Sequence, residues 1–259
     1  MLTSRLIVCL DVDDGRVKKG TRFQDLRTHD TPARMAAAYE RDGADEIVFL
    51  DISASVIGRE TVLEEVRSTA RALSIPLTVG GGIRSVDDIA ATLRAGADKV
   101  AINTAAVENP LLIADAAARF GAQCVVVSID ARCSADGWQV ATHGGRRATV
   151  LDAVQWAQRA VALGAGELLL TSIDRDGTQS GYDTELTHAI AVRVSVPVIA
   201  SGGAGEPAHL ADALQHGADA VLVAGIVHRG QETVASLKSY LTRTGFRMRE
   251  VAQEQRAYA

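Results

Sequence analysis

The sequence predicts an α/β protein folded as a (β/α)8 barrel with half-barrel internal duplication. Eight short apolar runs alternate with alanine-rich helical patterns, and the first half of the chain is echoed in the second. Gly81-Gly82 returns as Gly202-Gly203, and Gly96-Ala97-Asp98 returns as Gly217-Ala218-Asp219, both 121 residues later. Strand–helix units in unbroken series predict a parallel sheet with right-handed crossovers. Eight such units and a half-chain repeat favour closure into a barrel over an open sheet.

Each predicted strand is an apolar run bounded by turn residues, and a helical pattern follows it. The strands are expected at Leu6–Leu10, Glu46–Asp51, Leu77–Val79, Lys99–Ile102, Cys124–Ile129, Leu168–Ile173, Val196–Ala200 and Ala220–Ala224. Helices are expected at Pro32–Arg41, Thr61–Leu73, Val86–Arg94, Pro110–Phe120, Val150–Leu163, Thr184–Arg193 and Pro207–Gln215. Several helices stop at a glycine, which readily takes the left-handed conformation that ends a helix.

The chain is interpreted as one barrel domain over residues 1–259, with halves of about 1–120 and 121–245 and a loose tail at about 250–259. A length of 259 residues suits one large α/β barrel. No linker, low-complexity segment or shift in composition marks a second domain. Because the chain has only four Phe, four Tyr and two Trp, its core must be mostly Ala, Val, Leu and Ile, which is typical of buried parallel strands.

Composition and charge indicate which partners the protein can bind and in which cellular compartment it works. A net charge of −5 without a lysine or arginine stripe argues against binding to nucleic acid. Three cysteines give no disulfide framework and fit a reducing compartment. The apolar run that ends at Asp11 is too short for a signal peptide or a membrane span. We therefore expect a cytoplasmic protein without a membrane segment.

Two glycine-rich turns are candidate phosphate sites. Gly80-Gly81-Gly82 follows the third strand, and Gly202-Gly203 follows the seventh. Glycines at such turns let backbone N–H groups approach a phosphate, and the next helix adds positive potential at its N-terminus. Glycine pairs also serve simply as tight turns between a strand and a helix. Two pairs in symmetric register favour phosphate binding, and a ligand with a phosphate at each end.

Asp11 and Asp130 are expected to end the first and fifth strands, which lie across a barrel from one another. An acidic residue at a strand end is often only a turn or helix cap. Two carboxyl groups at one barrel mouth, however, would serve as acid and base for a substrate stretched between two phosphate sites. No histidine pairs with a cysteine or carboxylate at metal-ligand spacing, so we expect no metal and no cofactor.

Alternation along the strands predicts a ring of charges at the other end of the barrel. If Asp11 points inward, Arg5 does too, because side chains on a strand alternate with a period of two. The same pattern makes Glu46, Lys99 and Glu167 inward residues at the starts of the second, fourth and sixth strands. Buried charges are costly unless they are paired, so a mutually neutral ring is reasonable. Surface ion pairs at the barrel rim are the alternative. Small inward residues above the ring would permit a narrow axial passage.

Several of these segments resemble the cyclase subunit of imidazole glycerol phosphate synthase over nearly the whole chain. They are Cys9-Leu10-Asp11, Phe49-Leu50-Asp51-Ile52, Val79-Gly80-Gly81-Gly82-Ile83, Asn103-Thr104-Ala105, 170–178 (LTSIDRDGT) and Ala200-Ser201-Gly202-Gly203. The resemblance implies a duplicated (β/α)8 TIM barrel and a lyase of histidine biosynthesis. Its substrate is a bis-phosphorylated phosphoribulosyl formimino ribotide, which takes up ammonia. The products are imidazole glycerol phosphate and 5-aminoimidazole-4-carboxamide ribotide.

The resemblance also assigns roles to individual residues. Asp11 and Asp130 are the acid/base pair, and Lys19 belongs to a basic lid between Asp13 and Asp30, a segment that composition alone leaves equally open to simple solvation. One phosphate is held by Gly82, Asn103 and Thr104, and the other lies near Asp176, Gly177, Gly203, Ala224 and Gly225. The charge ring of Arg5, Glu46, Lys99 and Glu167 corresponds to a gate on an ammonia passage.

Ammonia would then come from a separate glutaminase subunit docked over the gate, because no glutaminase portion is found in this sequence. Asp98 and Gln123 are candidate contacts with that subunit. The chain departs from the family at Val8, Val150, Val227 and Gly225, the last of which stands where a serine is usual. Two other functions stay open: the sister phosphoribosyl isomerase barrel, and a non-catalytic phosphate-binding scaffold for a glutaminase.

Overall fold

Eight parallel strands close into a ring in the computed structural model, which describes residues 3–21, 24–28, 30–52 and 63–250, with the backbone alone over 19–21 and 24–28. In ring order the strands are β1 (Arg5–Asp13), β4 (Glu46–Asp51), β5 (Leu77–Gly80), β6 (Lys99–Ile102), β7 (Val125–Ser134), β10 (Glu167–Ser172), β11 (Val198–Ser201) and β12 (Ala220–Val223). β1 pairs with both β4 and β12, which closes the ring. The predicted (β/α)8 TIM barrel is confirmed.

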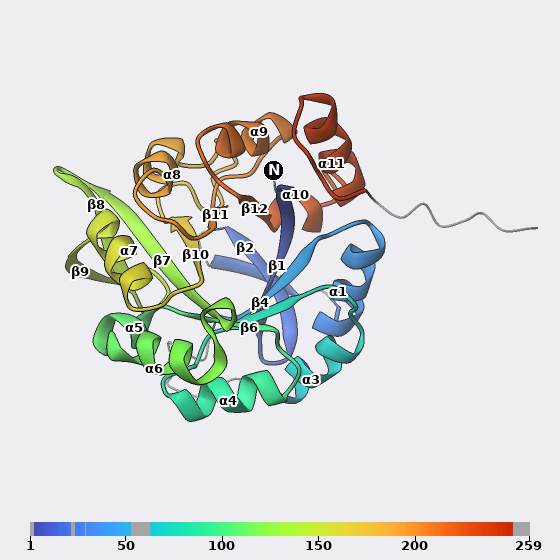
Figure 1. The fold of residues 1–259 in the computed structure, drawn as a ribbon. Coiled ribbons are helices and arrows are strands. Elements are labelled where there is room, and N and C mark those ends of the chain that lie inside the picture. The colour runs from blue at the N-terminus through green and yellow to red at the C-terminus, as the bar shows by residue number, and fades with distance from the viewer. Residues whose placement is uncertain (1–2, 22–23, 29, 53–62, 251–259) are drawn as a thin grey trace, which may run out of the picture.

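Helices surround the strands, as Figure 1 shows. The longer ones are α1 (Pro32–Arg41), α3 (Leu63–Arg71), α4 (Val86–Arg94), α6 (Leu111–Phe120), α7 (Ala153–Ala162), α8 (Thr184–Ala191), α9 (Pro207–Gln215) and α11 (Val234–Arg243). Short helices occur at α5 (Thr104–Glu108) and α10 (Gly225–His228), with a 3-10 turn at Ala122–Cys124. The predicted bounds of α1, α4 and α9 are confirmed. α11, which follows the last barrel strand and the short helix α10, was not among the predicted helices.

Two strands continue beyond the barrel as antiparallel hairpins that the sequence did not predict. β1 leads into β2 (Arg16–Thr21) and β3 (Gln24–Thr28), in the segment expected to be a loop. β7 leads into β8 (Gly137–Thr142) and β9 (Arg147–Asp152). The helix expected from Val150 therefore begins at Ala153, because Asp152 still pairs with Gln139 of β8. Asp152 then caps α7 by accepting a hydrogen bond from Gln155 N–H at 2.8 Å.

The interior of the barrel is an apolar layer between two polar ends. Its members are Ile7, Cys9, Val48, Ala101, Val126, Leu169, Ile199, Ala220 and Leu222, all buried. They alternate along each strand with residues that face the helices, such as Leu6, Val8 and Leu10 of β1. This arrangement follows from strand geometry, since successive side chains on a strand point to opposite faces of the sheet. Charged side chains lie below the layer and the candidate site lies above it.

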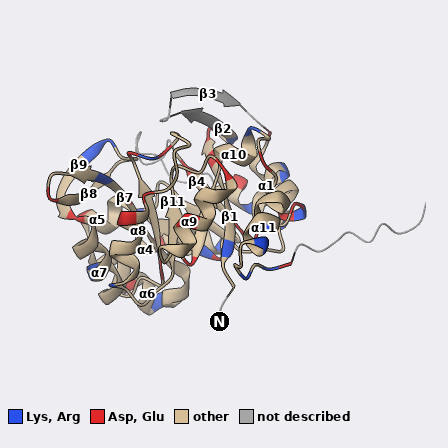
Figure 2. Ribbon diagram, turned by 90° about the horizontal axis from the view of Figure 1, so that it is seen from above, with Lys and Arg blue, Asp and Glu red and all other residues tan. Residues whose placement is uncertain are grey.

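The C-terminal helix α11 is attached to the start of β4 through a buried lysine. Lys238 Nζ donates to Gly43 O at 2.8 Å and lies 2.6 Å from Asp45 Oδ1. Asp45 also accepts from Leu6 N–H at 2.8 Å and from Arg249 Nε at 2.7 Å. These contacts hold α11 against the N-terminal end of the barrel, where β1 begins (Figure 2). The expected tail at 250–259 lies almost entirely outside the described residues.

Among the residues that the structure describes, no helix is long and apolar enough to cross a membrane.

Candidate active site

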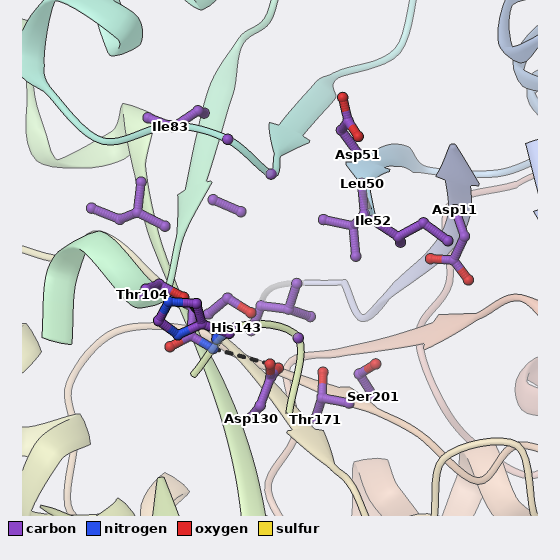
Figure 3. Close-up of a pocket in the computed structure, with 18 of the residues that line it drawn as sticks. Asp11, Leu50, Asp51, Ile52, Ile83, Thr104, Asp130, His143, Thr171 and Ser201 are labelled. Atoms are coloured by element: carbon purple, nitrogen blue, oxygen red, sulfur yellow. Dashed lines mark hydrogen bonds between the residues drawn. The ribbon is translucent and has the colours of Figure 1, made fainter. Parts of the chain in front are cut away.

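A cavity of about 630 Å³ opens at the carboxyl ends of the barrel strands. In α/β barrels this end carries the active site. Eight of the residues that the sequence predicted for the site line the cavity: Asp11, Gly82, Asn103, Thr104, Asp130, Asp176, Gly177 and Ala224. Figure 3 shows the carboxyl groups of Asp11 and Asp130 directed into the same open space. The volume lies in the range of small-molecule sites, about 300–1,000 Å³.

Asp11 and Asp130 come from opposite sides of the ring. Asp11 lies on β1 and Asp130 on β7, and three strands separate β1 from β7 in either direction. Both strands extend past their aspartates into hairpins, so neither residue ends its strand as predicted. A substrate lying across the mouth would therefore have one carboxyl group on each side of its centre.

The environment of Asp130 makes its carboxyl group a proton donor or acceptor near neutral pH. Burial raises the pKa of Asp130 to about 6, and the charge of Asp176 adds to this rise. A hydrogen bond from Asn103 Nδ2 to Asp130 Oδ2, 3.0 Å long and dashed in Figure 3, acts in the opposite direction. Desolvation disfavours the charged carboxylate, whereas a donor stabilises it. The net effect is a carboxyl group whose pKa lies close to the working pH of most enzymes.

Asp11 is held on a strand that is fixed from both sides. Cys9 Sγ lies 3.6 Å from Asp11 Oδ1 on the same inward face of β1. The backbone carbonyl of Cys9 accepts a hydrogen bond from His228 Nε2 at 3.0 Å, while His228 Nδ1 lies 2.6 Å from Tyr39 Oη. Because Nε2 must donate to the carbonyl, the neutral tautomer leaves Nδ1 free to accept from the tyrosine hydroxyl. α10 and α1 thus brace β1 next to Asp11.

The first glycine turn lies at the cavity wall as predicted. Gly81 has a φ of +95°, and a β-carbon there would collide with the carbonyl oxygen of Asp51. Gly82 lines the cavity with a φ of +72°. Nearby, Thr104 Oγ1 accepts from His143 N–H at 2.9 Å, so the β8–β9 turn rests on this end of the site. We call this region the first loop end.

The second glycine turn is more enclosed, and we call its surroundings the second loop end. Gly203 has a φ of +109°, and a β-carbon on it would collide with the carbonyl of Gly181. Gly177 and Ala224 line the cavity, whereas Gly203 and Gly225 are not among its lining residues. Gly225 begins α10 directly after Ala224, so its backbone still adjoins the mouth.

At the opposite end of the barrel the predicted ring of four charges forms a closed circuit. Lys99 Nζ lies 2.8 Å from Glu46 Oε2 and 2.8 Å from Glu167 Oε2. Arg5 Nη1 lies 3.0 Å from Glu46 Oε2, and Arg5 Nη2 is paired with Glu167. Burial alone would lower the pKa of Arg5, but the carboxylates of Glu167 and Glu46 raise it. Each cation thus touches both carboxylates, and the alternative of scattered pairs at the rim does not hold.

Sequence reasoning missed several polar residues of the cavity. Thr171 on β10 pairs in register with Asp130 on β7 and with Ser201 on β11, and all three line the cavity as one row. Period-two alternation combined with strand register would have found them. His143 and Arg146 enter from the β8–β9 turn. No pattern in the sequence pointed to these two residues, because the hairpin that carries them was not predicted.

Three predicted residues lie elsewhere. Lys19 is on β2, paired in register with Arg27, and its side chain lies outside what the structure describes. Asp98 and Gln123 are exposed at the starts of strands, on the same end of the barrel as the charge ring. Within the described part of the chain, no group of three or more His, Cys, Asp or Glu residues is arranged to hold a metal ion.

Comparison with known proteins gives the family. The family described as "Histidine biosynthesis protein" matches residues 5–233. Proteins named imidazole glycerol phosphate synthase subunit HisF are similar over nearly the full chain. The one from Myxococcus xanthus strain DK1622 is 59% identical over 252 residues, covering 97% of this chain and 100% of that protein. The one from Metallosphaera sedula is 57% identical over 250 residues (96% and 100%), and that from Mycobacterium tuberculosis strain H37Ra is 53% identical over 255 residues (96% and 96%).

Proposed function

Because this chain belongs to the HisF family, the cyclase subunits of imidazole glycerol phosphate synthase in histidine biosynthesis, we propose that Asp11 and Asp130 are its acid/base pair. The substrate in this proposal is the phosphoribulosyl formimino-aminoimidazole carboxamide ribotide, which reacts with ammonia. The products are imidazole glycerol phosphate and 5-aminoimidazole-4-carboxamide ribotide. The observation that carries the proposal is the pair of carboxyl groups on β1 and β7 that face one cavity between two glycine turns.

The substrate lies across the mouth with one phosphate at each loop end. Gly82, Asn103 and Thr104 bind one phosphate, and Asp176, Gly177, Gly203, Ala224 and Gly225 surround the other. Backbone N–H groups at glycine turns can approach an anion closely because no side chain intervenes. The positive φ values of Gly82 and Gly203 support this assignment, since both turns need glycine. Lys19 on the β2–β3 hairpin completes the closed site as part of a lid.

Proton transfers are divided between the two carboxyl groups. Ammonia attacks the ribulosyl carbonyl carbon while the Asp130 carboxyl group gives its proton to the carbonyl oxygen. Loss of water from the resulting carbinolamine gives an imine. Asp11 takes a proton from the added ammonia and serves ring closure. Cleavage of the C–N bond then releases the carboxamide ribotide. A pKa of about 6 for Asp130 supports its part, because a general acid works best when its pKa is near the working pH.

Ammonia reaches the cavity from the other end of the barrel. Arg5, Glu46, Lys99 and Glu167 form its gate, and the apolar layer above them is the wall of the passage. A separate glutaminase subunit docks over this end and supplies the ammonia, with Asp98 and Gln123 as contacts. The exposure of both side chains on that face supports the assignment. The compartment that follows from this pathway is the cytoplasm.

The barrel arose from a half-barrel that was duplicated, and residues 1–259 form one domain with halves of about 1–120 and 121–245. Asp98 Oδ2 accepts from Leu77 N–H at 2.8 Å, and Asp219 Oδ2 accepts from Val198 N–H at 2.9 Å. Both residues of the second pair follow those of the first by 121 positions. The repeated hydrogen bond supports the duplication because it adds a shared contact to the shared sequence.

An assay with ammonium chloride tests the catalytic proposal. The wild-type protein is expected to convert the ribulosyl substrate without a glutaminase, and Asp130→Asn and Asp11→Asn are each expected to lose at least about a hundredfold in turnover, the usual range for a positioned acid or base. Preserved substrate binding in both variants separates lost chemistry from lost affinity and excludes a mere scaffold. Turnover of the ribosyl isomer in place of the ribulosyl substrate would identify the sister isomerase.

A further inference from the structure

We propose that Arg229 binds the second phosphate of the substrate and occupies the space that a side chain at position 225 would need. This assignment rests on the proposed function, in which the second loop end receives a phosphate. It concerns a residue of this chain that follows α10, outside the residues lining the cavity.

The distribution of positive charge around the cavity is uneven. Among the described lining residues, Arg84 and Arg146 are the cations, and both belong to the first loop end. Arg84 follows the Gly82 turn, and Arg146 lies in the β8–β9 turn that rests on Thr104. The lining at the second loop end carries a carboxyl group, Asp176, and no cation. A phosphate dianion placed there needs a compensating charge from outside the lining.

Helix geometry brings Arg229 to that place. Arg229 follows Gly225 by four residues, and its N–H donates to Gly225 O at 3.0 Å. Side chains on a helix tilt toward its N-terminus, so a residue at i+4 covers the residue at i. Accordingly, a β-carbon built on Gly225 would lie 2.8 Å from both Nη1 and Nη2 of Arg229. The guanidinium group lies directly over the glycine that adjoins the cavity mouth.

The guanidinium is held from one side only. Arg229 Nε donates to Gln231 Oε1 at 3.1 Å, and Gln231 Nε2 donates to Gln179 Oε1 at 3.4 Å. Gln179 belongs to the same segment as Asp176 and Gly177, so these contacts connect Arg229 to the second loop end. Neither Nη group has a hydrogen-bond acceptor in the part of the chain that the structure describes. Two adjacent N–H donors in a fixed plane match two phosphate oxygens.

The glycine at 225 and the arginine at 229 are therefore coupled. The family that this chain resembles usually has a serine at 225, whose hydroxyl would contact the phosphate. A serine β-carbon in this protein would displace the guanidinium, since the two groups compete for one space. The displaced atoms are the far end of a flexible side chain, so the backbone can stay in place. A guanidinium thus replaces a hydroxyl as the ligand of the second phosphate.

Two measurements on Arg229→Ala test this assignment. Calorimetric titration with the ribulosyl substrate in the absence of ammonia is expected to show a Kd about tenfold higher than that of the wild type, or about 1.4 kcal/mol. With saturating ammonium chloride, the KM is expected to rise by a similar factor while kcat stays within about twofold. The double variant Arg229→Ala/Gly225→Ser is expected to regain part of the affinity, because the space is then free for a serine hydroxyl.

Arg193→Ala is the matched control, because Arg193 is an exposed arginine near the end of α8 that hydrogen-bonds Ala189 O. It is expected to leave Kd and KM unchanged. An Arg229→Ala variant with a Kd within twofold of the wild type overturns the assignment, and so does a double variant that binds no better than the single one. A wild-type protein that binds the substrate but does not turn it over would refute the proposed function and leave the binding test intact.

Discussion

Asn103 donates a hydrogen bond from Nδ2 to Asp130 Oδ2 at 3.0 Å and a second one to Ala141 O at 3.1 Å. One side chain therefore connects β6, the candidate general acid on β7 and the β8 strand of the hairpin. Asn103 also precedes Thr104, whose hydroxyl oxygen accepts a hydrogen bond from the backbone N–H of His143 in the same hairpin. If the first loop end binds a phosphate as proposed, Asn103 connects that phosphate to the protonation state of Asp130.

Asn103→Ala is expected to shift the pH dependence of the reaction. Removing the donor takes away a contact that stabilises the carboxylate, so the pKa of Asp130 rises above its value of about 6. As a general acid, Asp130 must be protonated, and the wild-type rate falls as pH rises through this pKa. The falling limb of kcat/KM should therefore move to higher pH, measured at a constant concentration of free ammonia.

Thr104→Ala is the control for this measurement. It loosens the same loop end, since Thr104 Oγ1 holds His143 N–H, but Thr104 has no hydrogen bond to Asp130. Its KM should rise while the pH limb stays where it is in the wild type. A rising limb that moves to higher pH in Asn103→Ala would show that Asp130 acts in its ionised form, and a falling limb that moves to lower pH would contradict the stabilising effect of Asn103 on the carboxylate.

Asp130→Asn is expected to stabilise the fold as it abolishes turnover. Burial raises the pKa of Asp130 from 3.8 to about 6, so the folded state binds the proton more tightly than the unfolded state. Between these values, stability falls as pH rises, and the loss is complete above the folded pKa. Urea unfolding at about pH 8 should show a gain on the order of 1–3 kcal/mol for the variant, because one pKa unit corresponds to about 1.4 kcal/mol.

The sign of this effect is checked at low pH. Near pH 4 the wild-type carboxyl group is protonated in the folded state, so the difference between wild type and Asp130→Asn should largely vanish. Asp87→Asn serves as the comparison, since the Asp87 side chain is 93% exposed and pairs with Arg119. A variant that is less stable than the wild type at pH 8 would contradict the assigned burial of Asp130.

The parts of this molecule that follow local patterns were predictable from the sequence. The bounds of β4, β6, α1, α4 and α9 match the expected ranges, because apolar runs, proline starts and glycine ends are local signals. The charge ring was also predictable, since period-two alternation places Arg5 on the same face as Asp11. Its closure by Lys99 needed only the order of strands around a barrel.

Features that depend on distant pairing were not predictable. The last residues of β9, from Val150 to Asp152, were assigned to the start of a helix, and only pairing with β8 fixes them as part of a strand. His143 and Arg146 were missed with it. The raised pKa of Asp130 depends on burial and on Asp176, which lies on a different loop. Such effects arise from the assembled barrel and leave no trace in local composition.

Gly81→Ala is expected to destabilise the protein more than Gly144→Ala does. Both glycines have positive φ, +95° at Gly81 and +63° at Gly144. An added β-carbon at Gly81 would collide with the backbone of Asp51, whereas at Gly144 nothing lies within 4 Å. Gly144→Ala should cost about 1 kcal/mol, the usual penalty of the left-handed conformation. Gly81→Ala should cost on the order of 2–4 kcal/mol, because the backbone must move.

Thermal and urea unfolding of the two variants provide the comparison. The collision also moves the turn that leads to Gly82, so Gly81→Ala should raise the KM for the substrate in addition to lowering the melting temperature. Equal stability of the two variants would mean that the close approach between Gly81 and Asp51 carries no energetic weight.

Lys99→Met is expected to separate two routes of ammonia supply. Lys99 Nζ contacts both Glu46 and Glu167, and its removal leaves two carboxylates with Arg5 as their remaining partner in the ring. The ring must then rearrange, and in the proposed function ammonia from a glutaminase would no longer pass through it efficiently. Ammonia from ammonium chloride enters through the open mouth of the barrel. Turnover driven by ammonium chloride should therefore stay within about twofold of wild type. The measured quantity is the ratio of glutamine-driven to ammonium-driven turnover with a glutaminase subunit present.

This ratio should fall for Lys99→Met, and stability should fall too, because breaking one partner of a mostly buried pair costs on the order of 1–4 kcal/mol. The side chain of Lys99 is 17% exposed, so solvent screens part of that cost. Arg67→Met is the control, since Arg67 and Glu64 form an exposed pair on α3 and neither belongs to the charge ring. It should change neither the ratio nor the stability by a measurable amount. A Lys99→Met protein whose two turnover rates fall in parallel would show that the ring supports the fold without guiding ammonia.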